Sequence, residues 1–449
     1  MSSAAPTIPA WRRSTLAIAL IGSGLMWAAL PNDLLRGLGS LGWLGWVAPV
    51  PWLLLVRFDT LPGRRPYRAL YLAGFAFWLA AIYWLSLPYP ATIPLWILLA
   101  SYLAFYLPVF VGLSRVAVHR LSIPLWLAAP IVWTGLELAR AHLLTGFLMA
   151  SLAHTQVKWT ALIQVSDLVG EYGVDFVVML TAACLASLLR ISDCGLRFGS
   201  GNLQSEIRNP KSVFRPIALV PAAVVLTATL TYGHARLSAE AAAGGGSNPS
   251  GPRVALIQGN SLAEWKTESE KKQMQIMDEY VDLSEKAVAA SKKIGDGRIP
   301  DLVVWPETMY RNPLREFAPG FQLPPREKTT TKEITAGDRR ELVRLATHLG
   351  SPLLVGIDRY DFLSSHAPGT DAPAFRAYNS AALAELNGNV STYDKIQLVM
   401  FGEYVPFAHW IPMLDRLSSL TGSVEAGDKP VAMCSGKYCF VPDICYETV

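Results

Sequence analysis

The sequence predicts a membrane-embedded bundle of helices followed by an α/β domain. Of the 449 residues, 51% are hydrophobic and only 16% are charged, which is too apolar for a wholly soluble chain. Lysine is also unevenly spread, because only Lys158 and Lys211 precede residue 250 and eleven lysines follow it. We therefore expect seven transmembrane α-helices within residues 1–236, a linker over 237–252 and an α/β domain over 253–449.

Seven apolar stretches are candidates for membrane helices, because a hydrocarbon core about 30 Å thick needs roughly 17–25 apolar residues. They are Ser14–Leu30, Gly37–Val56, Ala69–Leu87, Ile93–Leu113, Ile123–Leu138, Leu162–Leu189 and Pro216–Gly233. The first stretch is followed by others rather than by a signal-peptide cleavage pattern, so we expect it to remain as a span.

The basic residues predict the orientation, because lysine and arginine favour cytoplasmic connections. One set of connections holds Arg12, Arg13, Arg57, Arg64, Arg65, Arg68, Arg115, Arg120, Arg190, Arg197, Arg208, Lys211 and Arg215. The opposite set holds only Arg36, Arg140 and Lys158. We expect the N-terminus in the cytoplasm and everything after Gly233 outside it.

Polar residues near the spans bear on function, because a buried ionisable group in lipid is usually paired or functional. Glu171 and Tyr172, in the stretch GEYGVDF, are expected at the outer interface or lining a site. Seven spans also suit a transporter or a receptor. A transporter predicts paired charges deep within the spans, and the sequence offers few.

The linker is expected because Ala241–Pro252, AAAGGGSNPSGP, combines helix-breaking glycine and proline with nothing apolar to bury. Beyond it, strand-like and helix-like runs alternate, which is typical of a layered α/β domain. The expected elements are a strand at Val254, an amphipathic helix over Glu268–Lys293, a strand over Asp301–Glu307, a helix near Asp338–Leu349, a strand over Pro352–Ile357, and a hairpin of Tyr378–Leu386 with Asn389–Lys395 that turns at Asn387 and Gly388. Two long stretches, Met309–Thr335 and Phe401–Pro430, are expected to be irregular.

Three polar residues directly follow strand-like runs: Glu307 after LVVWP, Lys395 after the hairpin and Cys445 after FVPDI. Strand ends are where α/β sheets present their sites. A carboxylate that accepts a thiol proton, beside an ammonium that stabilises an oxyanion, provides the groups for acyl transfer. Taken singly, a solvated glutamate, a solvated lysine and an inert buried cysteine are equally ordinary.

Composition and spacing argue against other chemistries. The net charge of +4 comes without a basic run interleaved with aromatic residues, so we expect no nucleic-acid partner. No HExxH motif or paired CxxC spacing suggests a metal site, and we expect no cofactor. Cys434 and Cys439 flank an expected hairpin turn, SGKY, and either pair in an oxidising compartment or stay free. Cys184, in a span, and Cys194, in a cytoplasmic loop, are expected to be reduced.

Three motifs carry a family resemblance. VVWPE, the DK of YDKIQLVMFGEYVPF and ICYE resemble the glutamate, lysine and cysteine motifs of the nitrilase (carbon–nitrogen hydrolase) superfamily. Together with seven N-terminal spans, they resemble the bacterial apolipoprotein N-acyltransferase family. The resemblance implies an αββα sandwich and a catalytic triad of Glu307, Lys395 and Cys445.

The resemblance also implies a reaction. Cys445, deprotonated by Glu307, takes an acyl group from a membrane phospholipid as a thioester. The α-amine of an S-diacylglyceryl cysteine at the N-terminus of an apolipoprotein then receives it. Lys395 and the backbone N–H of Tyr446 hold the oxyanion. The implied location is the bacterial inner membrane, with the catalytic domain on the periplasmic side.

The supporting residues follow from the same resemblance. Glu403 in FGEYVP is expected to hydrogen-bond the lysine or the incoming amine, or otherwise to be a solvated loop carboxylate. Tyr446 and Glu447 are expected to orient the nucleophile. Trp265 is expected near the acyl chain, or to act as an interfacial anchor.

Two further expectations complete the prediction. The alternative function is a membrane-anchored amidohydrolase that passes the acyl group of a small amide to water, although such an enzyme needs one anchor rather than seven spans.

Family members continue past the ICYE motif and return through an eighth span. The chain is therefore expected to be incomplete at its C-terminus, with an exposed strand edge and little stability or activity.

Overall fold

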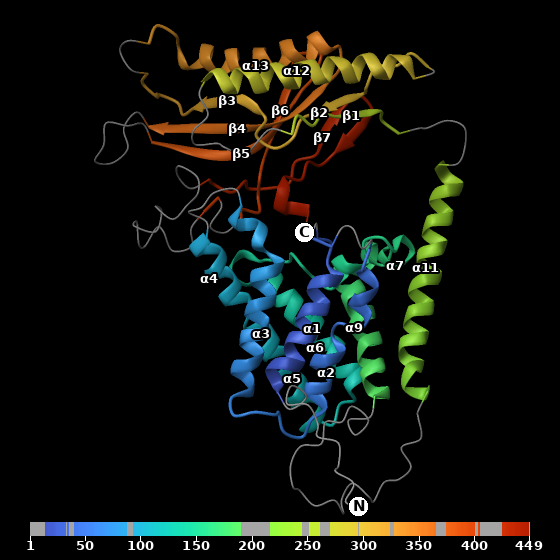
Figure 1. Ribbon diagram of the computed structural model, residues 1–449. Coiled ribbons are helices and arrows are strands. Elements are labelled where there is room, and N and C mark those ends of the chain that lie inside the picture. The colour runs from blue at the N-terminus through green and yellow to red at the C-terminus, as the bar shows by residue number, and fades with distance from the viewer. Residues whose placement is uncertain are drawn as a thin grey trace, which may run out of the picture. The chain divides into compact units, whose positions relative to one another are not determined.

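The computed structural model describes the chain in twelve segments. These are residues 14–32, 34–35, 40–87, 93–189, 216–244, 251–260, 270–294, 296–323, 327–364, 374–399, 403–404 and 424–448. The chain divides into two compact units, Met1–Asn248 and Pro249–Val449, and each has its own hydrophobic core (Figure 1).

The regular structure of the first unit is helical throughout its described residues. Its helices are α1 (Thr15–Ala29), η3 (Gly42–Trp46), α2 (Val50–Arg57), α3 (Pro66–Ala81), η4 (Tyr83–Ser86), α4 (Ile93–Leu103), α5 (Tyr106–His119), α6 (Leu125–His142), η6 (Leu143–Thr145), η7 (Ala153–Gln156), α7 (Thr160–Ile163), α8 (Ser166–Val169), α9 (Glu171–Leu188), η8 (Pro216–Leu219) and α11 (Val220–Gly244). Apolar residues run along nearly every one of them, so packing rather than amphipathic patterning sets their arrangement.

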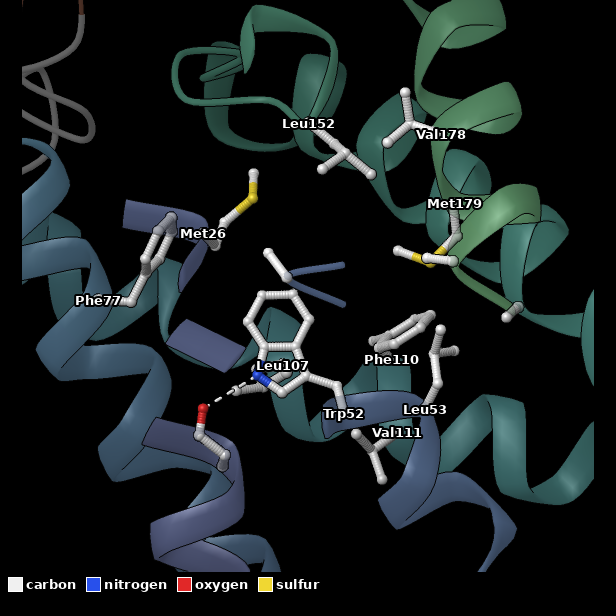
Figure 2. Packing of buried hydrophobic residues seen from close by; sticks show 14 of the residues in the cluster. Met26, Trp52, Leu53, Phe77, Leu107, Phe110, Val111, Leu152, Val178 and Met179 are labelled. Atoms are coloured by element: carbon white, nitrogen blue, oxygen red, sulfur yellow. Dashed lines mark hydrogen bonds between the residues drawn. The ribbon is translucent and has the colours of Figure 1, made fainter. Parts of the chain in front are cut away.

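Aliphatic and aromatic side chains pack together in the core of this bundle, as Figure 2 shows around Trp52. The Trp52 indole Nε1 donates a hydrogen bond to the Ala19 carbonyl of α1 at 3.1 Å. A Cβ added to Gly22 would lie 2.5 Å from that nitrogen, so only glycine lets α1 accept the indole. Phe110 of α5 and Met179 of α9 pack into the same cluster, which joins helices distant in sequence.

Three helical stretches in the described residues are long and apolar enough to cross a bilayer: Ile93–His119, Glu171–Leu188 and Ile217–Ala239. Two expected spans are interrupted. The span over 162–189 is divided into α7, α8 and α9, because the chain turns at Gly170 with φ +65°. The span over 37–56 contains the separate helices η3 and α2, with Pro49 capping α2. The count of seven spans therefore stays a prediction.

Helix α11 is longer than the sequence predicts. It continues to Gly244, eleven residues past the expected end at Gly233 and into the segment expected to be irregular. The reason is local propensity, because alanine is the strongest helix former and the stretch from Ala235 to Ala243 contains five alanines. The expectation of irregular backbone from Ala241 onward is wrong for residues 241–244.

The second unit is built on a mixed sheet. Its elements are β1 (Val254–Leu256), α12 (Glu270–Lys293), β2 (Leu302–Val304), β3 (Tyr310–Phe317), α13 (Thr331–Leu349), β4 (Leu353–Ser364), β5 (Ala374–Ala384), β6 (Val390–Asp394), β7 (Met433–Ser435), β8 (Tyr438–Phe440) and η10 (Cys445–Thr448). The six-stranded sheet runs β1-β2-β4-β5-β6, with β3 also paired to β4. Strands β1 to β4 are parallel, and β5 and β6 join antiparallel through the expected hairpin at Gly388.

The two faces of the sheet are covered differently. Helices α12 and α13 cover one face, where Tyr280 and Leu342 pack on Val355 and neighbouring strand residues (Figure 1). On the other face, Met433 and Ile444 from the C-terminal segment pack on residues such as Leu354. The αββα sandwich itself stays a prediction.

Strand β3 corrects the expectation that Met309–Thr335 is irregular, and α13 begins at Thr331 rather than near Asp338. The Pro313 in β3 hid the strand, because proline is confined to edges and bulges. The β3–β4 register indeed shifts between Tyr310 and Leu314, around that proline. Of the stretch Phe401–Pro430, residues 401–402 and 405–423 lie outside the described residues.

Candidate active site

Glu307 lies where the chain detaches from β4 between β2 and β3. Val304 at the end of β2 pairs with Leu354, and Tyr310 at the start of β3 pairs with Ile357. The five residues that connect β2 to β3 therefore stand opposite only two residues of β4. The surplus bulges away from the sheet, with Thr308 in the left-handed region at φ +57°. A Cβ on Gly356 would lie 2.5 Å from the Glu307 Cα, so glycine in β4 admits this bulge.

Trp305 fixes the start of the bulge. The residue is 2% exposed, and its indole Nε1 donates to Ser284 Oγ of α12 at 2.8 Å. The Trp305 ring therefore holds the end of β2 against the helices, while the Glu307 side chain, 31% exposed, remains accessible.

Lys395 directly follows β6 and, among the expected site residues whose side chains the structure describes, is the most deeply buried, at 1% exposure. Its backbone N–H donates to the Asn379 carbonyl at 2.9 Å, and its own carbonyl accepts from the Gly427 N–H at 2.8 Å. Its Nζ lies 2.8 Å from Glu403 Oε1 and 3.6 Å from Glu307 Oε1. The ammonium is therefore held between two carboxylates from different segments.

Cys445 is brought to the same place by the C-terminal segment. Strands β7 and β8 form the expected hairpin, closed by a disulfide between Cys434 and Cys439. Met433 and Ile444 then pack on the sheet face opposite the helices, which delivers Cys445 to that face. Cys445 is exposed and adopts φ +53° at the start of η10, a strained conformation typical of functional positions.

Asn379 joins the two glutamates, and sequence reasoning missed it. Its Nδ2 donates to Glu307 Oε1 at 2.6 Å and to Glu403 Oε1 at 2.9 Å, and the residue is 8% exposed. In the sequence it lies inside the strand YNSAALAEL and looks like an ordinary strand residue. The signal that could have indicated it is a polar side chain shortly before the apolar run AALA of the same strand.

The charges of the site favour a protonated thiol and a charged lysine. Burial raises the pKa of Cys445, and the Glu307 charge raises it further, while Lys395 acts in the opposite direction. Burial by itself would lower the pKa of Lys395, but the Glu403 hydrogen bond and the charges of Glu403 and Glu307 raise it above its ordinary value. The thiol hydrogen-bonds the Glu307 side chain, so a base lies in contact with the nucleophile.

Glu447 connects the segments on either side of the site. Its Oε1 accepts from the Ile396 N–H at 2.6 Å and from the Tyr393 hydroxyl at 2.6 Å. Its Oε2 accepts from the Ile444 N–H at 2.8 Å. Since Ile396 follows Lys395 and Ile444 precedes Cys445, this carboxylate fixes the spacing of the lysine and cysteine backbones.

Glu403 and Asp358 complete the polar environment. Glu403 is 8% exposed and its Oε2 accepts from the Val399 N–H at 2.9 Å, so it is not a solvated loop carboxylate. Asp358 stands opposite Asn379 across β4 and β5. Burial raises the pKa of Asp358 to about 6, with Glu307 adding to the shift and Arg311 opposing it.

The remaining expected residues are placed only in part. Tyr446 lies in η10, and its side chain falls outside the described residues, as does all of Trp265. Glu171 and Tyr172 begin α9 and are both partly buried, and Glu171 Oε2 lies 3.1 Å from His154 Nε2. Their expected interfacial position stays a prediction.

Comparison with known proteins identifies the family. Residues 22–184 match the model of the apolipoprotein N-acyltransferase N-terminal domain. The chain is 31% identical over 418 residues to the apolipoprotein N-acyltransferase of Geobacter metallireducens, covering 90% of this chain and 69% of the relative. The chain belongs to the apolipoprotein N-acyltransferase family.

Two more relatives agree with this assignment. The apolipoprotein N-acyltransferase of Rhodopirellula baltica is 28% identical over 91% of this chain and 72% of its own length. The enzyme of that name from Neisseria meningitidis serogroup A is 25% identical over 90% of this chain and 69% of its own length. The similarity therefore spans both units, and with the apolar helices it identifies a membrane protein.

Proposed function

We propose that Cys445 carries an acyl group from a phospholipid to the N-terminal amine of a lipoprotein. Family membership makes this chain an acyltransferase of lipoprotein N-acylation. The observation that supports the residue assignment is the contact of three groups from separate segments: the Glu307 carboxylate, the Lys395 ammonium and the Cys445 thiol. The bulge after β2, the end of β6 and the start of η10 carry these three groups.

In the first step, the thiol proton moves to Glu307 and the sulfur attacks the ester carbonyl of the phospholipid. Lys395 stabilises the oxyanion, together with the backbone N–H of Tyr446. The carbon–oxygen bond then breaks, and the departing alkoxide takes the proton from Glu307. A thioester on Cys445 and a lysophospholipid result.

In the second step, the α-amine of the diacylglyceryl cysteine attacks the thioester. Glu307 accepts a proton from the amine, the carbon–sulfur bond breaks and the thiolate regains the proton. The product is an amide. Glu403 holds Lys395 in place throughout, because it accepts a hydrogen bond from the lysine Nζ. Asn379 holds Glu307 in the same way, by donating to its carboxylate.

We also propose the bacterial inner membrane as the location, with a cytoplasmic N-terminus and the catalytic unit on the periplasmic side. The support is the arginine distribution together with the disulfide between Cys434 and Cys439, which suits an oxidising compartment. Labelling of single cysteines introduced at Thr60 and Lys437 with a membrane-impermeant reagent tests this. The cysteine at position 437 should react in intact cells, and the one at position 60 only after permeabilisation.

The function is tested with the purified chain, a phospholipid and a synthetic peptide that begins with S-diacylglyceryl cysteine. Mass spectrometry should show the peptide gaining one acyl chain on its amine. Cys445→Ala should abolish this gain. Hydrolysis of a small amide, without transfer of an acyl chain to the peptide, would instead support the amidohydrolase alternative.

A further inference from the structure

The membrane unit contains a hollow that the proposed reaction does not use. Its volume is about 440 Å³, and its walls come from η3, from the segment entering α7 and from α11. Residues with polar or aromatic side chains form part of its lining: Ser40, Trp43, Lys158, Trp159 and Thr160. Leu162 and Leu230 supply apolar walls.

The walls of the hollow are fixed by direct contacts between α11 and its neighbours. A Cβ on Gly233 would lie 1.7 Å from the Ala161 carbonyl oxygen, so α11 touches the α7 backbone there. The Tyr232 hydroxyl donates to Asp167 Oδ1 at 2.8 Å, and Arg236 Nε lies 3.0 Å from Asp167 Oδ2. These contacts hold α11 against α7 and α8, so the hollow is present before any ligand binds.

One wall of the hollow belongs to α11, a helix whose apolar surface is largely exposed. Only 17% of the apolar window of Ile217–Ala239 is buried inside the unit, so most of this helix is left for the bilayer to cover. Leu230 of the same helix lines the hollow. A chain of lipid lying along α11 therefore reaches the hollow without leaving an apolar surface.

The polar and aromatic part of the lining has the chemistry of a phosphate site at a membrane interface. Lys158 is exposed, and among the described residues no carboxylate lies within ion-pair distance of it; Asp167 is engaged by Arg236. Trp43 and Trp159 are 54% and 49% exposed, and tryptophan favours the level of lipid headgroups. Lysine binds phosphate as a point charge and attracts anionic lipid.

We propose that this hollow binds the phosphate-bearing headgroup of a glycerophospholipid. Lys158 lies against the phosphate, the hydroxyls of Ser40 and Thr160 donate to its oxygens, and one acyl chain follows Leu230 along α11. The bound lipid is retained rather than consumed, because the residues that line the hollow include no thiol, carboxylate or imidazole. The inference rests on the membrane unit alone and is independent of Cys445.

Native mass spectrometry of the full chain, with phosphatidylglycerol added to the detergent, tests the proposal. Lys158→Gln should weaken retention of one lipid about fivefold, as expected for the loss of one charge near a headgroup. The matched control Arg120→Gln removes an exposed charge beyond α5 and should retain the lipid fully. Leu230→Trp, which fills the hollow without changing charge, should also lose it.

Two further ligands identify what is bound. Diacylglycerol, which lacks phosphate, should not be retained, and inorganic phosphate should not displace the lipid. Equal retention by wild type and Lys158→Gln would overturn the proposal, as would retention of diacylglycerol or displacement by phosphate alone. Cys445→Ala should keep the lipid, so failure of the acyl-transfer proposal and failure of this one are distinguishable.

Discussion

Each unit contains a buried pair of glutamate and a basic residue, and the two pairs are built differently. In the membrane unit, Glu137 and Arg140 lie one turn apart on α6 and hydrogen-bond each other. In the catalytic unit, Glu403 lies eight residues after Lys395 and contacts it, and the lysine also approaches Glu307. The first pair involves α6 alone, whereas the approach of Lys395 to Glu307 joins the end of β6 to the bulge after β2 and so requires the sheet.

The two pairs also differ in what else the basic residue contacts. Arg140 donates its other N–H groups to the carbonyls of Phe147 and Met149, each at 2.8 Å, so it ties the chain after α6 to the helix. Lys395 faces a partly exposed carboxylate beside a thiol. A charge surrounded by its own backbone stabilises a fold, and a charge beside an accessible nucleophile can serve a reaction.

The largest effect on activity is expected at Glu307, the proposed base. Glu307→Gln should lower acyl transfer by roughly 10³- to 10⁴-fold, because the amide cannot accept the thiol proton. Thermal unfolding in detergent should be nearly unchanged, since glutamine still accepts from Asn379. Transfer is measured with the diacylglyceryl peptide.

The matched control is Glu285→Gln, which changes an exposed carboxylate on α12 that pairs with His348. It should leave transfer unchanged. Comparable losses in both variants would show that Glu307 acts through general charge and not as the base.

Breaking the pair of Glu137 and Arg140 should lower stability and leave activity nearly unchanged. Arg140→Met leaves Glu137 as a buried charge without its partner, which is expected to destabilise the unit by about 3–5 kcal/mol. Transfer per folded molecule should stay within a few fold of wild type. Unfolding and transfer are measured on the same sample, and a large loss of transfer without loss of stability would contradict the structural role.

How far the sequence predicts the site depends on where each residue lies. Glu307, Lys395 and Cys445 stand in recognisable motifs after strand-like runs, so residue order indicates them. Asn379 lies within β5, and only the register of β5 against its neighbours brings it between the two glutamates. Contacts that depend on register cannot be inferred from one strand alone.

The same limit explains the fold predictions. Strands β1, β2 and β4 and the hairpin of β5 and β6 carry clear apolar runs or an Asn-Gly turn, and the structure confirms them. Strand β3 carries Pro313 and three charged side chains, so its pairing with β4 is a tertiary effect. The break at Gly170 depends on a left-handed conformation that hydropathy does not report.

A smaller effect is expected for Asn379→Ala. Glu307 and Glu403 each lose a donor, so transfer per folded molecule should fall about 10- to 100-fold. Thermal unfolding measured on the same sample gives the folded fraction and distinguishes this positioning role from simple instability.

Asn312→Ala is the control for that variant, because Asn312 is exposed and donates to Glu341 at 3.0 Å outside the site. Its transfer per folded molecule should match wild type. Unchanged transfer per folded molecule in Asn379→Ala would show that Asn379 does not position the site.

The smallest effect concerns Asp358 and pH. Its pKa is raised from 3.8 to about 6 in the folded chain, so the folded state holds this proton more tightly than the unfolded state. Stability should therefore fall as pH rises from about 4 to 6 and then level off. Asp358→Asn should flatten this slope and stabilise the catalytic unit by about 3 kcal/mol at pH 7. Unfolding at about pH 4.5 and pH 7 measures both; an unchanged slope would contradict the assignment.

Intact-protein mass spectrometry after incubation with phospholipid, without acceptor peptide, tests most directly whether Cys445 carries the acyl group. We expect an added mass of one acyl chain on Cys445 that neutral hydroxylamine removes. Cys445→Ala should show no adduct, and Glu307→Gln should form it far more slowly. A folded chain that acylates the peptide but never carries an adduct on Cys445, even when the peptide is withheld, would contradict the account.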